Sequence, residues 1–424
     1  MQFLVNWLEG ASNAALEERA TVGHLRILID FQNVTMHLFK DKTEDGVHIS
    51  LYGLAEGLSH DWWILFGGRD AEISLLDYRG GYIVPDVRLS FDGALLEVSA
   101  RQKIYQNPNI RFWSGITELL ERTSAEIILS EFIDSVITRM ESKGIEATSA
   151  QLRWARIKES RLDPDEAMFC EAAGSLGLDP YQIEESYADL IEKAGELFDS
   201  EALLELLAGS KEFDQVRLLE WIVHAEHRPK RFSRLSNLIH LRDQAVSQAP
   251  NRALEPSWAL GYRRARVMRK VMDLKSTDKF RSFRDVGKGL GASSDFKIGA
   301  NVNGLRALRV EEHKEAHIHL RHHGDFAEAR SLHLFSFVRA IGDAVCFPQS
   351  KRSPVNDLHS AYRQSAGRAF AAEFLAPIEE ISAMKEDGLD NVSIADEFGV
   401  STEVVIRQIE NKERISKACS LRPD

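Results

Sequence analysis

The apolar residues of the chain follow one spacing in its N-terminal part and another further on, so no single repeating architecture fits the whole sequence. Short apolar runs separated by turn residues fill residues 1–115. Residues 86–91 alternate polar and apolar, Asp92-Gly93 is the commonest dipeptide of a two-residue hairpin turn, and residues 95–98 resume the apolar run. Such runs on both sides of a tight turn predict two antiparallel strands. We therefore expect a β-rich N-terminal module over residues 1–115.

Helix signals replace the strand pattern in the middle of the chain. Asp163-Pro164 and Asp179-Pro180 each place a capping side chain directly before a proline. Proline is favoured at the first helical position because its missing N–H is not needed there. We expect a helical middle region over residues 116–250 and a third region over residues 251–424. A chain of 424 residues is long enough for two to four domains, so the predicted fold class is multidomain α+β.

The composition is that of a globular protein outside the membrane, since 44% of the residues are hydrophobic and 28% are charged. No run approaches the roughly 20 apolar residues that cross a bilayer. Residues 1–20 contain three glutamates and lack the basic leader of a signal peptide. Cys170, Cys346 and Cys419 are few and far apart, which suits a reducing compartment. We therefore expect a cytoplasmic protein.

Positive charge is concentrated in one segment of a chain whose net charge is −12. Residues 228–290 contain 16 Lys and Arg but only 5 Asp and Glu. Within this segment, a helix is predicted over residues 258–274, and five of its cations are Arg263, Arg264, Arg266, Arg269 and Lys270. Such a helix most often presents a solvated face, and the alternative is contact with a phosphate or an acidic partner. Nucleic-acid binding through residues 228–290 is therefore one hypothesis.

Two segments of the third region carry the most specific pattern in the sequence. Residues 335–343 read FSFVRAIGD, and residues 368–377 read RAFAAEFLAP. Both resemble the ImmA/IrrE metallopeptidase family, in which the first segment reads roughly FTLAHELGH and the second FAAELLMP. The resemblance implies that residues 251–424 form a zincin-like α+β domain.

The same resemblance places residues without metal-binding capacity at the zinc positions of the family. In such sites a helix presents two His ligands at i and i+4, and a Glu beside the first His is the general base. Arg339 and Asp343 take the two His positions, Ala340 takes the Glu position, and Gln364 takes the position of a third ligand, a Glu. Arginine offers no lone pair, alanine accepts no proton, and an amide oxygen is a poor substitute for a carboxylate. The resemblance therefore implies a pseudo-peptidase with no catalytic residue, metal or cofactor.

The helical spacing also predicts what replaces the metal. Opposite charges at i and i+4 lie on one face of a helix, so Arg339 and Asp343 are expected to form an ion pair. Gln364 is expected to lie opposite them if the family fold is retained. The alternative is that Arg339 and Asp343 are ordinary surface residues.

The C-terminal residues 392–406 look like a helix-turn-helix. Ser393 with Asp396 gives a start similar to a capping box, Gly399 a left-handed stop, and Ser401 a second cap. The same pattern closes the peptidase domain in the ImmA/IrrE family. The would-be recognition helix begins with apolar and acidic residues, where base-reading helices carry Arg, Asn or Gln, so we do not expect it to read DNA.

A histidine-rich segment offers a rival metal site. Residues 313–323 contain five histidines, and alternate residues of a strand share one face. Imidazole is a common zinc ligand. The ligands of an active zinc metallopeptidase would be drawn from this segment (His313, His317, His319, His322 and His323) and from Asp343, His333 and His359.

Three functions are consistent with these patterns. The first is a noncatalytic regulatory or scaffold protein that binds another protein. Active relatives in the resembled family cleave repressors or antitoxins, so the resemblance implies a setting in stress response, toxin–antitoxin systems or phage defence. The second is an active zinc metallopeptidase with unusual ligands, and the third is a nucleic-acid-associated regulator. No feature of the sequence predicts a membrane partner.

Overall fold

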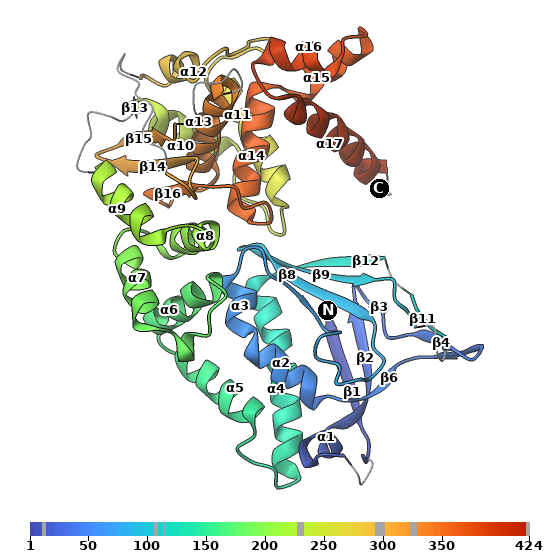
Figure 1. Ribbon diagram of the computed structural model, residues 1–424. Coiled ribbons are helices and arrows are strands. Elements are labelled where there is room, and N and C mark those ends of the chain that lie inside the picture. Colours follow the sequence, from blue (N-terminus) through green and yellow to red (C-terminus); the bar gives the residue numbers. More distant parts are fainter. Residues whose placement is uncertain are drawn as a thin grey trace. The chain divides into compact units, whose positions relative to one another are not determined.

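The computed structural model describes residues 1–10, 14–105, 109–113, 115–226, 233–292, 302–322 and 329–420. The chain divides into two compact units, Met1–Ile191 (unit 1) and Glu192–Asp424 (unit 2). The division falls inside residues 116–250, so the helices of the expected middle region are shared between the units. Both units combine helices with antiparallel strands, which confirms the mixed α and β composition (Figure 1).

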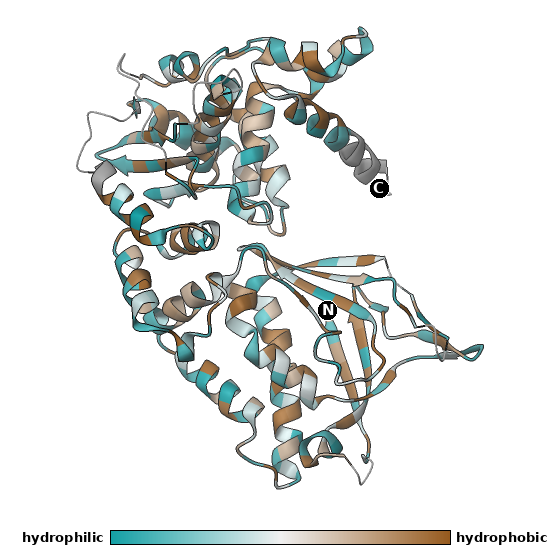
Figure 2. Ribbon diagram, in the orientation of Figure 1, coloured by the Kyte–Doolittle hydropathy of each residue, from teal (hydrophilic) through white to brown (hydrophobic). Residues whose placement is uncertain are grey.

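Unit 1 contains three small antiparallel sheets among its described residues. The first pairs β2 (Val22–Ile29) with β1 (Gln2–Trp7), β3 (Gln32–Asn33) and β6 (Val47–Ser50). The second has the order β10 (Ile104–Tyr105), β11 (Ile110–Phe112), β4 (His37–Phe39), β5 (Lys42–Glu44). The third has the order β12 (Ile116–Glu121), β9 (Leu95–Arg101), β8 (Asp86–Phe91), β7 (Glu72–Ser74). Figure 2 shows apolar residues interleaved with polar ones along these strands, as expected of strands with one buried face.

The predicted hairpin is confirmed in the third sheet. Strands β8 and β9 pair in register from Phe91 opposite Leu96. Oδ1 of Asp92 accepts the N–H group of Ala94 in the turn at 2.9 Å and that of Leu95, the first residue of β9, at 2.8 Å. Gly93 has φ 105°, a conformation in which a side chain would be strained. The Asp-Gly pair therefore sets the turn and, through it, the register.

The helices of unit 1 include the two capped elements that the sequence predicts. Asp163 caps α6 by accepting the N–H of Asp165, with Pro164 in the first turn. Asp179 accepts the N–H of Tyr181 but begins a short 3-10 helix rather than an α-helix. The helices are α1 (Leu16–Ala20), α2 (Tyr52–His60), α3 (Trp62–Gly67), α4 (Arg122–Ser142), α5 (Ser149–Ser160), α6 (Pro164–Ser175), η1 (Pro180–Gln182) and, across the boundary between the units, α7 (Glu185–Gly195).

Aromatic side chains pack among the aliphatic residues of the core of unit 1. Trp62 and Trp63 are each 2% exposed and belong to this core. The ring of Trp62 lies 5.0 Å from that of Trp154 on α5. Cys170 is buried in the same core as a free thiol.

The described residues of unit 2 form one four-stranded antiparallel sheet in the order β13 (Ser233–Leu235), β15 (Glu315–Leu320), β14 (Ala307–Glu312), β16 (Arg352–Val355). The basic helix predicted over residues 258–274 is confirmed as α11. Helices α11, α13 and α14 pack on one another in the core beside the sheet. The helices of unit 2 are α8 (Ser200–Ser210), α9 (Gln215–Glu226), α10 (Leu238–Gln248), α11 (Ser257–Val271), α12 (Phe283–Gly289), α13 (Ala329–Cys346), α14 (Tyr362–Leu375), α15 (Ile378–Glu386), α16 (Asn391–Phe398) and α17 (Thr402–Ser420).

The two C-terminal helices meet at the predicted turn. Gly399 ends α16 in the left-handed conformation with φ 67°, and Ser401 Oγ accepts the N–H of Val404 at the start of α17. The predicted cap at Ser393 is wrong, because α16 begins earlier and Asp390 accepts the N–H of Ser393. In α17, Gln408 is fully buried and donates to the main-chain oxygen of Ala376 at 2.9 Å. A polar side chain therefore fixes α17 to the end of α14.

Among the described residues, no helix has both the length and the apolar character that a membrane span requires.

Candidate functional site

The candidate site lies where α13 packs against α14 and the sheet of unit 2. Nearly all of α13 from Ser336 onward is buried. A Cβ on Gly342 would lie 2.7 Å from Cδ1 of Phe370 on α14, closer than well-packed carbon atoms approach. The glycine therefore allows a close crossing of the two helices. Because of this crossing, polar side chains from both helices meet inside the core.

Arg339 and Gln364 form the first part of this polar centre. Arg339 is only 5% exposed, and its Nη2 donates to Oε1 of Gln364 at 3.0 Å and to the main-chain oxygen of Asn356. Gln364 also accepts the N–H of Asn356 at 3.0 Å and donates to the main-chain oxygen of Pro354 at 2.8 Å. The prediction that Gln364 faces Arg339 is confirmed. The side-chain oxygen that a metal would need already accepts two N–H groups.

The second part is the carboxylate of Asp343. Among the residues that the structure describes, Asp343 pairs with Arg309 and Arg363 rather than with Arg339, so the predicted i,i+4 ion pair is wrong. Nε of Arg363 lies 2.5 Å from Oδ1, and Nε of Arg309 lies 2.9 Å from Oδ2. Two nearer guanidinium groups, from α14 and from β14, occupy the carboxylate. Arg339 points instead to the segment after β16.

Buried charges of both signs stabilise one another around Asp343. Burial alone would raise the pKa of its carboxyl, but Arg363 and Arg309 outweigh burial and hold that pKa below its usual range. Arg309 also pairs with Glu311, which accepts a hydrogen bond from Arg242 at 2.7 Å. An uncompensated buried charge costs several kcal/mol. A metal at Asp343 would therefore have to displace two arginines that need this carboxylate.

Where the resembled family has its general base, this chain has the methyl group of a core alanine. Ala340 is fully buried among the apolar residues of unit 2 and offers no proton acceptor. Next to it, burial together with the charge of Arg368 lowers the pKa of Arg339 to about 9. Arg339 is still a cation at neutral pH, and a cation repels an incoming metal ion.

Helix α8 packs against the segment next to Arg339. Nδ2 of Asn356 donates to the main-chain oxygen of Glu205 at 2.7 Å. A Cβ on Gly209 would lie 2.3 Å from the same Nδ2 atom, so this glycine permits the contact. The chain itself therefore encloses the site on the side of α8.

We expect Arg339→Met to lower the free energy of unfolding by about 1–3 kcal/mol, because methionine cannot donate to Gln364 or to the buried main-chain oxygen of Asn356. Loss of the positive charge itself should cost little, because the carboxylate paired with Arg339, that of Asp357, lies 3.8 Å from its Nη1 and is largely exposed. A similar-sized apolar side chain removes the cost of burying the cation. Urea unfolding at neutral pH measures the change. A loss above about 3 kcal/mol would show instead that Arg339 is an essential structural cation.

Glu373 of the FAAE motif has a structural role at the end of α14. It is 2% exposed, pairs with Arg266 at 2.6 Å and accepts the N–H of Ile378 at 3.1 Å. Nε2 of Gln408 donates to the same carboxylate at 3.3 Å. Glu373 therefore ties α11, α15 and α17 to α14.

The cations of α11 do not form the exposed patch that their spacing suggests. Arg264 and Arg269 are 1% and 5% exposed. They donate to the main-chain oxygens of Val345 and Phe374, at 2.6 and 2.5 Å. These oxygens belong to the last turns of α13 and α14, where the helix dipole favours a cation.

Two more cations of α11 are paired within the protein. Arg263 pairs with Glu255 at 2.5 Å, and Arg266 pairs with Glu373. Among these five cations, Lys270 is the one that is exposed and has no partner in the described part of the chain. A common phosphate-binding face of Arg263, Arg264, Arg266, Arg269 and Lys270 is therefore not present. Residues 228–232 of the predicted basic segment lie outside the described residues.

The histidine-rich segment spans a tight turn and a buried strand. His313 lies in the turn between β14 and β15 with φ 49°. The ring of His319 on β15 lies 5.8 Å from that of Trp221. Burial lowers the pKa of His319 to about 2, so its imidazole is neutral at physiological pH. His323 lies outside the described residues.

The other histidines named as candidate ligands lie apart from Asp343. His333 is buried near the rings of Phe283 and His322, and burial lowers its pKa. His359 is exposed, and its main-chain oxygen accepts a hydrogen bond from Arg368. Within the described ranges, no three His, Cys, Asp or Glu side chains are placed to hold a metal.

Sequence reasoning missed the arginines that hold Asp343. Arg309 lies in the buried strand β14, whose first four residues, 307–310, are otherwise apolar. A charged residue inside such a strand indicates a buried ion pair, and that signal was present in the sequence. Arg363 is adjacent to Gln364, but the sequence contains no sign that its side chain turns toward α13.

Comparisons with protein-family models, with curated proteins and with solved structures found no match to the chain. The resemblance to the ImmA/IrrE family therefore stays a prediction from residues 335–343 and 368–377.

Proposed function

We propose that the chain is a noncatalytic protein whose unit 2 is a degenerate metallopeptidase-like domain, and that it acts as a regulator or scaffold by binding another macromolecule. The observation that supports this proposal best is the pair of buried contacts at the expected metal position. Gln364 accepts from Arg339, and Asp343 accepts from Arg309 and Arg363. N–H groups of the protein thus use the electron pairs that zinc would require.

The lack of zinc-dependent peptide hydrolysis that we propose is a consequence of these contacts. A catalytic zinc site needs three protein ligands and lowers the pKa of a bound water to about 7. Here a cation, an arginine-bound carboxylate and a hydrogen-bonded amide take the ligand positions, and a methyl group takes that of the base. Hydroxide would not form at neutral pH on this arrangement.

The partner we propose is another protein in the cytoplasm. The setting in stress response, toxin–antitoxin systems or phage defence rests on the sequence resemblance alone. The helix pair α16 and α17 belongs to the same proposed domain and, with Gln408 and Val405 buried, supports packing within unit 2 rather than base reading.

A peptidase assay tests the proposal. Full-length protein is incubated with fluorescent casein, with added zinc and in parallel with a chelator, and Asp343→Asn is assayed beside it. We expect no chelator-sensitive cleavage by either protein. Cleavage by the wild type that a chelator abolishes and that Asp343→Asn loses would overturn the proposal in favour of an active metallopeptidase.

A further inference from the structure

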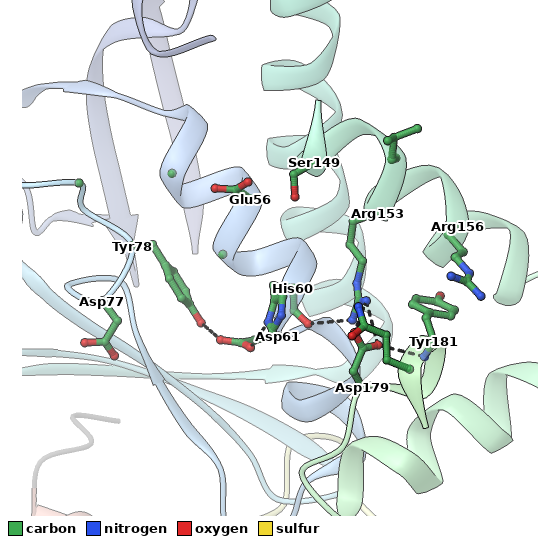
Figure 3. A pocket seen from close by; sticks show the side chains of 15 residues that line it. Glu56, His60, Asp61, Asp77, Tyr78, Ser149, Arg153, Arg156, Asp179 and Tyr181 are labelled. Carbon is green, nitrogen blue, oxygen red and sulfur yellow. Dashed lines mark hydrogen bonds and ion pairs between the residues drawn. The ribbon is translucent and has the colours of Figure 1, made fainter. Parts of the chain in front are cut away.

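Unit 1 contains an open groove of about 890 Å³ between α2 and α5 (Figure 3). Each helix lines it with residues spaced at i, i+3, i+4 and i+7, which share one helical face. On α2 these are Gly53, Glu56, Gly57 and His60, and on α5 they are Ser149, Leu152, Arg153 and Arg156. The groove belongs to unit 1 alone, so a ligand bound there is independent of the function proposed for unit 2.

One end of the groove is acidic. The hydroxyl of Tyr78 donates to Asp61, and Oδ1 of Asp61 lies 3.0 Å from Nδ1 of His60. Tyr78 lies so close to α2 that a Cβ on Gly57 would be 2.2 Å from its ring. The carboxylate of Asp77, beside Tyr78, is exposed and has no partner among the described residues. Because α2 ends at His60, the negative end of its dipole also favours a cation here.

The other end presents a cation on an aromatic platform. The guanidinium groups of Arg153 and Arg156 lie 4.6 and 4.1 Å from the ring centre of Tyr181. Arg153 is neutralised by Asp179, at 2.8 Å. Arg156 has no acidic partner in the described part of the chain. Nε1 of Trp63, a core residue, donates to the hydroxyl of Tyr181 at 3.1 Å. This hydrogen bond fixes the position of the Tyr181 ring under the two guanidinium groups.

Asp77 and Arg156 are the two lining residues of unlike charge that have no side-chain partner of opposite charge or hydrogen-bonding hydroxyl among the described residues, whereas Glu56 and Asp61 accept hydrogen bonds from Tyr52 and Tyr78. Figure 3 shows Asp77 and Arg156 at its opposite ends, with His60 between them. Leu152, on the α5 wall, leaves its apolar side chain 62% exposed. A volume of this size fits a drug-sized molecule or a short peptide.

The charge of unit 1 narrows the class of ligand. Residues 1–191 contain 17 Lys and Arg against 31 Asp and Glu, and so strong an excess of carboxylates repels a polyanion such as nucleic acid. We propose that the groove binds a peptide segment of a partner protein that carries a basic side chain and, a few residues away, an acidic one. The basic side chain pairs with Asp77, the acidic one pairs with Arg156, and an intervening apolar side chain packs on Leu152.

Matched changes in peptide and protein test this assignment. The probes are fluorescein-labelled Lys-Gly-Leu-Gly-Glu-amide and a version with two further glycines, titrated with full-length protein in low-salt buffer while anisotropy is recorded. The tighter binder of the two is then made with Gln in place of Lys, and separately with Gln in place of Glu. The protein variants are Asp77→Asn and Arg156→Gln. Asp189→Asn and Lys42→Gln change exposed charges outside the groove and serve as controls.

We expect each loss of a groove charge or of its peptide partner to weaken binding about two- to fivefold, as for exposed ion pairs. Combining Asp77→Asn with the Lys-to-Gln peptide, or Arg156→Gln with the Glu-to-Gln peptide, is expected to weaken binding no further. The control variants should bind as the wild type does. Absence of binding by both probes at millimolar protein, or losses that add in the matched pairs, would overturn the proposal. Neither result bears on peptidase activity, so this proposal and that for unit 2 fail separately.

Discussion

Replacing Asp343 with asparagine is expected to lower the free energy of unfolding by about 3–5 kcal/mol. The carboxylate neutralises Arg309 and Arg363, which are 0% and 2% exposed. An asparagine of nearly the same shape would leave Arg363 buried beside a neutral amide and Arg309 with Glu311 as its remaining carboxylate partner. The effect therefore comes from charge, because the side-chain volume hardly changes. Urea unfolding of the full chain at neutral pH measures the loss.

The matched control for this variant is Asp387→Asn, the same chemical change at an exposed residue at the end of α15. It should shift the free energy of unfolding by no more than about 0.5 kcal/mol. The pKa of Asp343 is lowered in the folded protein, so its contribution is present above its unfolded pKa of about 3.9 and is lost as pH falls through the folded value. The difference between wild type and Asp343→Asn should therefore shrink in acid. An equal difference at pH 7 and at pH 2 would contradict the charge explanation.

Replacing Gly174 with alanine is expected to destabilise unit 1 by about 3 kcal/mol. A Cβ at this position would lie 2.0 Å from the main-chain oxygen of Trp63 and 3.0 Å from the main-chain nitrogen of Ile64. Backbone cannot rotate away as a flexible side chain can, so α3 and α6 would have to separate. Trp63 also holds Tyr181 at the groove, so the same variant should weaken peptide binding there.

The control for this second variant is Gly195→Ala, at the last residue of α7. The nearest atom to its added Cβ, in the side chain of Leu203, would be 3.9 Å away. Alanine is a better helix former than glycine by up to about 1 kcal/mol, so this change should be neutral or stabilising. Thermal unfolding followed by circular dichroism compares the two variants. An equal effect of both alanines would show that the α3–α6 crossing is not tight.

Local signals in the sequence predicted the elements that depend on neighbouring residues. The Asp92-Gly93 turn, the proline-capped start of α6 and the left-handed Gly399 are each set by a few adjacent residues. The three separate sheets of unit 1 were not predictable in the same way. Strand β2, for example, pairs with both β1 and β6, and such pairing depends on contacts between distant segments.

Part of the candidate site was predictable, because the spacing of residues within one helix is a local signal. The i,i+4 spacing placed Arg339 and Asp343 on one face of a helix but predicted the wrong partner for Asp343, whereas the resemblance placed Gln364 opposite Arg339, where the two side chains form a hydrogen bond. The partner of Asp343 could not be read from the helix alone, because Arg309 lies 34 residues earlier on β14. Likewise, the arginines of α11 looked like a surface patch in sequence, since burial against the ends of α13 and α14 is a tertiary property.

The metal content of the purified full-length chain tests most directly whether the position of Arg339, Asp343 and Gln364 has lost zinc. The protein would be incubated with excess zinc, desalted, and analysed by inductively coupled plasma mass spectrometry beside Asp343→Asn. We predict well under one zinc per chain, with no difference between the two proteins. About one zinc per chain in the wild type, lost in Asp343→Asn although that variant remains folded, would contradict the assignment.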